Sequence, residues 1–439
     1  MASNAIKGNY ILDVFTLTNF DGSNVFNLKT YVQVIEFKED IYENVIMGKA
    51  TLTDGYGIPQ YLPLVGEELL SVGFKTSDDA ATYFKEFRVY KIINNARDAN
   101  QSSTSTYSIY FCSAEMMINE SMRIYRGYKN MLTSDIVSDI YQSYLLNDAS
   151  KTVNFQVTGQ AQQIVIPSLK PLQAMNMLCG YAQQTSSDSG FFLFYENADG
   201  FNFVNIETLY SQDSVAEYTV THDNTDALGL GSTESAYIPM TTNVQKGFDR
   251  LQAISNGLLA NTVEGFDMLS KGSITSSYSY ATQFSQTKHI EPNAYPITSL
   301  KNTDTTSQAY KFVNSRSLRG NSKYFIANDT DGVSFSKTYE QYLPFRTSMF
   351  LQASAVEIVC IVGGNTDLKA GDVITLNLDA RNALKNTETE QYDRYLAGRF
   401  LVRSVTHVLS GKYFTSTLLL IKDCYTKAIT AEPTFITKG

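Results

Sequence analysis

Residues 46–54 read Ile-Met-Gly-Lys-Ala-Thr-Leu-Thr-Asp, and this stretch sets the pattern for the N-terminal part of the chain. Its alternate positions form two sets, Ile46, Gly48, Ala50 and Leu52 against Met47, Lys49, Thr51 and Thr53. Because successive side chains of a strand point to opposite faces, this period of two predicts a strand with one dry face. The period returns at Leu70–Phe74 and Tyr107–Phe111, between turns rich in Gly, Asp and Pro. Residues 1–113 are therefore expected to form an antiparallel β-sheet domain.

The composition supports a folded chain dominated by strands. Of the 439 residues, 43% are hydrophobic and 18% are charged, which allows enough burial to offset the entropy of ordering. The chain has 29 Tyr and 25 Phe but no Trp, and aromatic and β-branched residues favour strands over helices. The length itself predicts about three domains.

After residue 114 the period changes from strand-like to helix-like. Ser134 is expected to cap a helix whose apolar stripe runs from Ile136 to Leu145. Pro171 suits the first turn of a second helix. The aromatic runs 191–195 and 201–206 flank a Gly-closed turn and predict a hairpin. Residues 114–230 are thus predicted to be an α/β domain.

The remaining segments predict a second β-barrel domain that is interrupted. It is expected to comprise residues 231–270 and 340–427, with 271–339 as an insertion domain and 428–439 as a C-terminal tail. The insertion is dominated by Ser, Thr, Tyr, Asn and Gln, a composition that favours surface strands and loops over a core.

Within these segments several elements can be placed. A short amphipathic helix is expected over 243–257, with Phe248, Leu251 and Ile254 on one side, and another helix near 339–352. The predicted strands are 355–362, 374–378, 399–409 and 413–421. The predicted fold class is therefore α+β and β-dominated.

The charge and the cysteine content limit the class of protein and the compartment that can be expected. The net charge of −9 argues against a protein that grips nucleic acid, because such binding depends on Lys and Arg neutralising phosphates. Four widely spaced cysteines (Cys112, Cys179, Cys360 and Cys424) are expected to be buried free thiols in a reducing compartment. No signal peptide and no apolar run of membrane-spanning length is apparent, so a cytoplasm-like milieu is expected.

Catalytic and metal-binding motifs are not found. The three histidines lack partners at ligand spacing, and the HExxH, CxxC, GxSxG and Walker A patterns do not occur. The segment 328–332, Asn-Asp-Thr-Asp-Gly, lacks the closing Glu of a calcium loop and is interpreted as a turn. The adjacent acids Glu39-Asp40 and Glu67-Glu68 are interpreted as solvated strand ends. The prediction is that the chain is not an enzyme and holds no cofactor or metal.

One polar pattern points to a surface instead. Arg399, Arg403 and His407 recur every four residues along one predicted strand. Positions separated by an even number share a strand face. The three side chains are interpreted as a solvated or interface stripe.

The N-terminal stretch 34–68 resembles the opening barrel of baseplate hub proteins of contractile-tailed bacteriophages. Its similarity lies in Val34–Tyr42, in Gly48–Asp54 and in the Gly-Tyr-Gly-Ile-Pro turn that follows. The far end is similar to the closing strands of the same family, through 368–378, Tyr395–Val402 and the strand after His407. The two helices and the aromatic hairpin match the family's middle domain, so the resemblance covers nearly the whole chain.

The resemblance implies a specific architecture and function. Two tail-tube-like barrels per chain, with three chains in a ring, would adapt a hexameric tail tube to a trimeric central spike and line the ejection channel. The implied partners are the tail tube protein, the central spike protein, the tape measure and other baseplate proteins, with DNA only in transit. The implied location is the virion tail, after assembly in the host cytoplasm. The residues expected at lumen or subunit surfaces are Arg399, Arg403, His407, Lys49, Thr51 and Thr53.

Two alternatives remain open at this stage. One is a tail-associated cell-wall hydrolase, since paired carboxylates act through spatial spacing that one sequence does not display. The other is a receptor-binding module, which the polar, aromatic-rich insertion favours.

Overall fold

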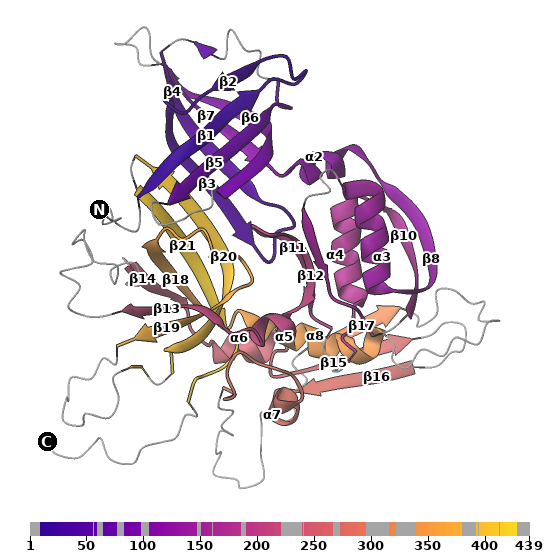
Figure 1. Cartoon of the computed structure of the whole chain (residues 1–439). Coiled ribbons are helices and arrows are strands. Elements are labelled where there is room, and N and C mark those ends of the chain that lie inside the picture. Colours follow the sequence, from indigo (N-terminus) through magenta and orange to yellow (C-terminus); the bar gives the residue numbers. More distant parts are fainter. Residues whose placement is uncertain are drawn as a thin grey trace, which may run out of the picture.

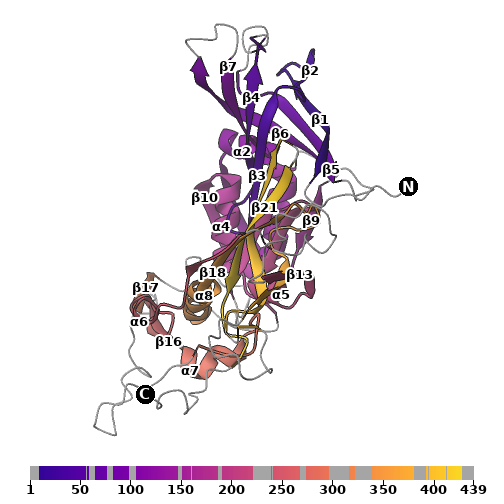
Figure 2. The same ribbon diagram turned by 90° about the vertical axis from the view of Figure 1, so that its left-hand side faces the viewer.

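The computed structural model describes residues 9–55, 57–58, 65–76, 83–97, 105–146, 151–159, 161–185, 190–220, 239, 241–266, 273–295, 316–321, 339–379, 392–393, 395–411 and 413–427. Strands predominate in these residues, as expected. The calcium-like turn at 328–332 and the tail 428–439 lie outside them. The molecule is elongated: the first strands occupy one end and the region of α7 (Tyr280–Gln283) the other (Figure 2).

The N-terminal module is an antiparallel sheet of seven strands. The strands are β1 (Tyr10–Thr18), β2 (Val25–Asn27), β3 (Val32–Asp40), β4 (Met47–Asp54), β5 (Leu69–Thr76), β6 (Tyr83–Arg97) and β7 (Ser105–Cys112). Their order is β3-β4-β7-β6-β5-β1-β2, and the sheet curls around its own core (Figure 1).

The predicted alternation in this module is confirmed. Ala50 and Leu52 are fully buried, as are Leu70 and Phe74, and each contributes to one aromatic-rich core. Gly48 is required by that core: a Cβ at this position would lie 2.3 Å from the ring of Phe111 and 2.6 Å from a backbone oxygen. The glycine therefore lets the Phe111 ring cross the strand.

The α/β module packs beside the first sheet (Figure 1). Its elements are α2 (Ala114–Ser121), β8 (Ile124–Leu132), α3 (Thr133–Ile140), a π-helical turn (Tyr141–Leu145), β9 (Thr152–Phe155), β10 (Ala161–Leu169), α4 (Pro171–Tyr181), β11 (Phe192–Glu196), β12 (Gly200–Asn205) and α5 (Ile206–Tyr210). The hairpin β11–β12 is the one predicted from the aromatic runs, and β9 adds to it in parallel.

The helix predictions hold except at one cap. The stripe from Ile136 to Leu145 is buried, and Pro171 is the first residue of α4. Ser134, however, is not the N-cap, because α3 begins at Thr133 and Leu132 takes the N-cap position. Ser134 instead pairs with Thr158: its backbone N–H donates to the Thr158 hydroxyl at 3.2 Å, and the Thr158 N–H donates to Ser134 Oγ at 3.4 Å.

The C-terminal strands form a second curled sheet. They are β13 (Ser214–Val220), β14 (Thr241–Lys246), β18 (Val356–Gly363), β19 (Val373–Leu378), β20 (Gly398–Ser410) and β21 (Tyr413–Lys422). The strands predicted from the sequence at 355–362, 374–378, 399–409 and 413–421 are confirmed. The order is β14-β18-β21-β20, with β19 on the other edge of β20 and β13 parallel to β19.

The two sheets are continuous through β20. Its first residues pair with β19, and its last seven, Ser404 to Ser410, pair with β3 of the N-terminal module. Val405 and Leu418 lie in the second core, while Leu409 and Phe414, further along β20 and β21, lie in the first. Two separate closed barrels are therefore not confirmed: in the described residues the strands form one open, 13-stranded sheet that curls twice.

The described residues between 250 and 353 build a smaller layer below the second sheet (Figure 1). It contains α6 (Arg250–Ser255), β15 (Ala260–Phe266), β16 (Ser273–Ser279), α7, a 3-10 turn (Phe284–Gln286), β17 (Arg316–Asn321) and α8 (Tyr339–Ala353). The three strands form a sheet of order β16-β15-β17, which takes strands from both sides of the expected boundary at residue 271. The domain boundaries themselves remain predictions.

Two expectations for this region are corrected. The helix α6 is shorter than 243–257, because 241–246 is the strand β14, and Leu251 is 80% exposed and does not face the core. Residues 278–295 are not a surface segment. Their large side chains join the second core, namely Tyr278, Tyr280, Phe284, Ile290 and Tyr295. The composition hid this, since tyrosines supply the apolar bulk that aliphatic residues supply elsewhere.

The cysteines follow the prediction, since all four are buried and none forms a disulfide. Among the described residues, no helix has the length and apolar character needed to cross a membrane.

Candidate functional site

The turn between β3 and β4 is the point at which the three modules meet. Ile41 belongs to the core of the second sheet, Val45 to the core of the α/β module and Ile46 to the core of the first sheet. A six-residue segment therefore contributes to all three cores. Packing of this one segment into three cores holds the modules together, and buried polar side chains gather beside it.

A buried ion cluster lies beside this turn. Lys151 Nζ is 2.7 Å from Glu115 Oε2 and 2.9 Å from Glu196 Oε1, and both carboxylates have less than 2% of their side chains exposed. The backbone N–H of Ile46 donates to Glu196 Oε2 at 3.1 Å. Burial raises the pKa of Glu115, although the Lys151 ammonium acts in the opposite direction. The cluster ties α2 and the β11–β12 hairpin to the turn.

A second buried carboxylate, Glu39, connects the first sheet to the second. Its side chain is fully buried, and Oε2 accepts the backbone N–H of Ala370 at 3.2 Å. Burial raises the pKa of Glu39 to about 8, so the carboxyl group is protonated at neutral pH. Asn197 of the hairpin donates to Ala370 O at 3.2 Å. The turn at Ala370 is thus held by both neighbouring modules.

This junction was missed from the sequence. The pairs Glu39-Asp40 and Glu67-Glu68 were expected to be solvated, but Glu39, Asp40 and Glu68 are each at most 3% exposed. The Glu68 carboxylate accepts N–H groups from its own turn, at 2.6 Å from Val65 N. One signal in the sequence does point to the burial of Glu39. It lies two residues after Phe37 and four after Ile35, so the alternation of β3 places all three on the same buried face.

The predicted arginine and histidine stripe is broken by a β-bulge. Between Val402 and Ser404 the pairing of β20 with β21 shifts by one residue. The inward-facing side chains of β20 are at even positions before this shift and at odd positions after it. Arg399 and Arg403 therefore face outward, but His407 points into the first core and is 1% exposed. Its ring packs between Phe37 and Phe414, and burial lowers its pKa to about 3. His407 is a neutral core residue and not part of a surface stripe.

Both arginines are occupied by contacts within the chain. The Arg399 guanidinium donates to the backbone carbonyls of Ile290 (3.3 Å), Tyr210 (3.1 Å) and Gln212. It therefore ties two segments, the one at 210–212 and the one at Ile290, to the start of β20. Arg403 lies over the ring of Tyr42, with 4.9 Å between its guanidinium carbon and the ring centroid, and its nitrogens are 3.8 Å from Asp40 and 3.6 Å from Glu357.

The residues predicted to form the polar face of β4 do lie on one face of that strand. Lys49, Thr51 and Thr53 are half-buried and alternate with the buried Ala50, Leu52 and Asp54. Thr51 Oγ1 lies 3.3 Å from Ser108 Oγ on the neighbouring strand β7. These three residues share an outward face; their assignment to a lumen or a subunit boundary stays a prediction.

A Thr-His-Asp arrangement occurs at the C-terminal end of β21. His289 Nδ1 is 2.7 Å from Asp423 Oδ2, and Nε2 is 3.1 Å from Thr287 Oγ1 and 2.8 Å from Phe284 O. A carbonyl only accepts, so Nε2 carries a proton, and Nδ1 donates to the carboxylate. With both nitrogens protonated, the ring has no lone pair with which to act as a general base. The arrangement is a buried ion pair that fastens residues 284–291 to β21.

This ion pair predicts a pH dependence of stability. Burial by itself lowers the pKa of His289, but Asp423 and the hydrogen bonds outweigh it, and the pKa is raised above its usual 6.5. The stabilisation is fully present below pH 6.5 and is lost as the pH rises through the folded-state pKa. Replacing His289 with glutamine should therefore cost more stability at pH 5.5 than at pH 9, as measured by urea unfolding followed by circular dichroism.

His407 provides a control, because its titration changes stability with pH in the opposite direction. Its folded-state pKa lies below 6.5, so the wild-type chain loses stability as the pH falls from 6.5 towards 3. The substitution His407→Gln should reduce that loss. If His289→Gln cost the same at both pH values, the buried imidazolium would be refuted.

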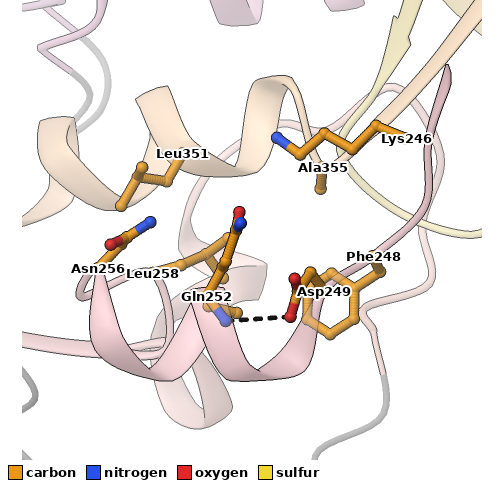
Figure 3. A pocket seen from close by; sticks show the side chains of 9 residues that line it. Lys246, Phe248, Asp249, Gln252, Asn256, Leu258, Leu351 and Ala355 are labelled. Carbon is orange, nitrogen blue, oxygen red and sulfur yellow. Dashed lines mark hydrogen bonds between the residues drawn. The ribbon is translucent and has the colours of Figure 1, made fainter.

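No group of three or more His, Cys, Asp or Glu side chains in the described part of the chain could hold a metal ion. A small open hollow lies between α6 and α8 and is lined by Lys246, Phe248, Gln252, Asn256 and Leu351, among others (Figure 3). Asp249 at its edge is used as the N-cap of α6, where it accepts the N–H groups of Leu251 and Gln252. The hollow brings together no nucleophile and base.

The polar site described here is a junction that joins three modules, and the known proteins similar to this chain include a phage baseplate protein. No family model matches the chain. Over 428 residues the chain is 20% identical to the probable baseplate hub protein gp334 of Vibrio phage KVP40, an alignment that covers 94% of this chain and 95% of that protein. The resemblance to baseplate hub proteins of contractile-tailed phages, inferred from residues 34–68 and 368–421, is confirmed.

Solved structures place the fold in the same group. The 43 kDa tail protein of prophage MuSo2 from Shewanella oneidensis matches with a TM-score of 0.53 and 9% identity, over 93% of this chain and 98% of that one. The tail protein from Neisseria meningitidis MC58 matches with a TM-score of 0.50 and 9% identity, over 95% and 98%. The chain therefore has the fold of phage tail proteins along almost its whole length.

Proposed function

We propose that this chain is a structural baseplate hub subunit of a contractile phage tail. Three copies form a ring that adapts the hexameric tail tube to the trimeric central spike and lines the channel for ejected DNA or protein. The protein works through geometry and not through catalysis. Its place is the virion tail, after assembly in the cytoplasm of the host.

The continuous double curl of the sheet carries this proposal. Two curled halves joined by β20 give one chain two tube-like units at a fixed spacing, so three chains present six units to a hexamer. The sheet also ends in strands that are paired on one side only among the described residues, namely β2, β13 and β14. Such edges are normally paired or covered, and neighbours in a ring can cover them. The full-length similarity to a probable baseplate hub protein supports the same role.

The proposed partners follow from the position of such a ring. The tail tube protein lies on one side, the central spike protein on the other, and the tape measure and other baseplate proteins contact it during assembly. A net charge of −9 suits a wall that lets DNA slide past without holding it. Arg399, Arg403, Lys49, Thr51 and Thr53 stay as proposed surface residues, with Arg399 and Arg403 also serving within the chain.

The trimer is the first result to look for. Light scattering after size-exclusion chromatography should give three times the 49.0 kDa mass of one chain, with the purified spike protein added if needed. The chain should also be recovered by mass spectrometry from purified tail particles, together with tube and spike proteins. A chain absent from tail particles would contradict the hub role. Clearing of a peptidoglycan suspension by the purified chain would favour a tail-associated hydrolase instead.

A further inference from the structure

A row of polar side chains crosses four neighbouring strands on the outer face of the first sheet. In the strand register Glu36 of β3 lies opposite Lys49 of β4, Lys49 opposite Tyr110 of β7, and Tyr110 opposite Lys91 of β6. The neighbouring Tyr90 is 38% exposed, and its ring centroid is 6.3 Å from that of Tyr110. We name these five residues the Lys-Tyr-Lys row.

The two lysines of this row share one aromatic ring. Lys49 Nζ lies 5.8 Å and Lys91 Nζ 5.5 Å from the centroid of Tyr110, both within the range of a cation–π contact. Neither ammonium has a carboxylate within 4 Å in the part of the chain that the structure describes. Two like charges near one ring repel each other, so an anionic group from outside is favoured here.

Three other lysines on the surface show the contrasting arrangement. Lys38 pairs with Asp40 and Glu43, Lys75 with Asp13, and Lys369 with Asp199, each within the chain. The two lysines of the row have no such ion pair among the described residues, and together with the exposed Glu36 they give the row a net charge of +1 on a protein whose net charge is −9. Its two tyrosines add the rigid aromatic area that protein interfaces favour.

We propose that the Lys-Tyr-Lys row is a contact surface for an acidic face of a second copy of this chain. The proposal rests on the ring described above. A closed three-fold ring uses two different surfaces at each boundary, so a positive patch can meet an acidic surface elsewhere on the next copy. The net charge means that acidic surface predominates on every copy, and the unpaired lysines offset the repulsion between copies.

Nucleic acid fits this row less well. Two lysines release only about two counterions, far fewer than a surface that grips a DNA duplex does. Two ammonium groups beside two aromatic rings match a patch of acidic side chains on a protein better.

The test compares two double variants with the same change in charge. In Lys49→Glu/Lys91→Glu, like charges would face each other at the boundary, and the dissociation constant of the trimer should rise at least about tenfold at low salt. The control Lys75→Glu/Lys369→Glu alters lysines that already have exposed partners, and association should stay within about threefold of wild type. Lys49→Arg/Lys91→Arg keeps both charges and should preserve association. Sedimentation velocity at low and high salt measures all three, with thermal unfolding to show that each variant folds.

The outcomes separate this contact from the hub role. If Lys49→Glu/Lys91→Glu associates as tightly as the wild-type chain, the proposal is overturned. Recovery of the chain in tail particles would still support the hub role. A wild-type chain that does not self-associate even with the spike protein present also overturns it, while particle composition decides the hub role separately. Loss of binding to a labelled DNA duplex in that variant, with association intact, would assign the row to nucleic acid and overturn the self-contact.

Discussion

Replacing Lys151 with methionine is expected to lower the free energy of unfolding by about 3–5 kcal/mol at neutral pH. The substitution leaves Glu115 and Glu196 buried side by side without their shared ammonium group. Methionine fills a similar volume, so the loss reports the uncompensated charge and not a cavity. Because burial raises the pKa of Glu115, protonation relieves part of the repulsion in acid, and the loss should be smaller at pH 5.

The matched control is Lys369→Met, because its partner Asp199 lies on the same hairpin as Glu196. Lys369 pairs with Asp199 at 2.7 Å, but 63% of the Asp199 side chain is exposed. Exposed pairs contribute roughly 0–1 kcal/mol, so this variant should unfold within about 1 kcal/mol of wild type. Urea unfolding followed by tyrosine fluorescence measures both. Equal losses for the two variants would show that the ion cluster does not hold the junction.

Glu39 gives the second large effect, which is a slope against pH. The unfolded carboxyl titrates near 4.5 and the folded one near 8, so between these values the folded state holds a proton that the unfolded state has lost. Stability therefore falls as the pH rises through this window, by about 1.4 kcal/mol per pH unit from this group. Glu39→Gln keeps an acceptor for the Ala370 N–H and removes the titration. The variant should gain on wild type progressively between pH 5 and 8, by roughly 4 kcal/mol in all.

The control for this slope lies on the same strand. Glu36 is exposed on the opposite face of β3, and Glu36→Gln should follow the pH dependence of the wild-type chain. Unfolding curves in urea at four pH values, recorded by circular dichroism, give the slopes. A Glu39→Gln variant whose stability runs parallel to wild type across the window would mean that Glu39 is not buried as a neutral acid.

Period and turn chemistry predicted most of the elements, because those signals are local. The alternation at Ala50 and Leu52 placed β4 and its faces, and Pro171 placed the start of α4. The prediction that Arg399, Arg403 and His407 share one face is wrong for His407, because the bulge moves every later residue of β20 to the opposite face. A bulge depends on pairing with β21, which no local pattern of β20 contains.

The candidate site was harder to predict, since it exists only in three dimensions. Glu115, Lys151 and Glu196 are separated by 36 and 45 residues along the chain and show no spacing that marks them as partners. Single acidic residues are usually solvated, and that general rule gave the wrong answer for Glu39. The tyrosines of 278–295 were misjudged for a related reason: their burial depends on β21 and α8, which are distant in sequence.

The strand β20 has a mechanical consequence. Seven consecutive residue pairs, from Ser404–Asp40 to Ser410–Val34, join it to β3, and the two strands run antiparallel. A force that pulls the two halves of the molecule apart along these strands loads the ladder in shear, so its hydrogen bonds must break together and not one after another. The subunit is therefore expected to resist extension along these strands.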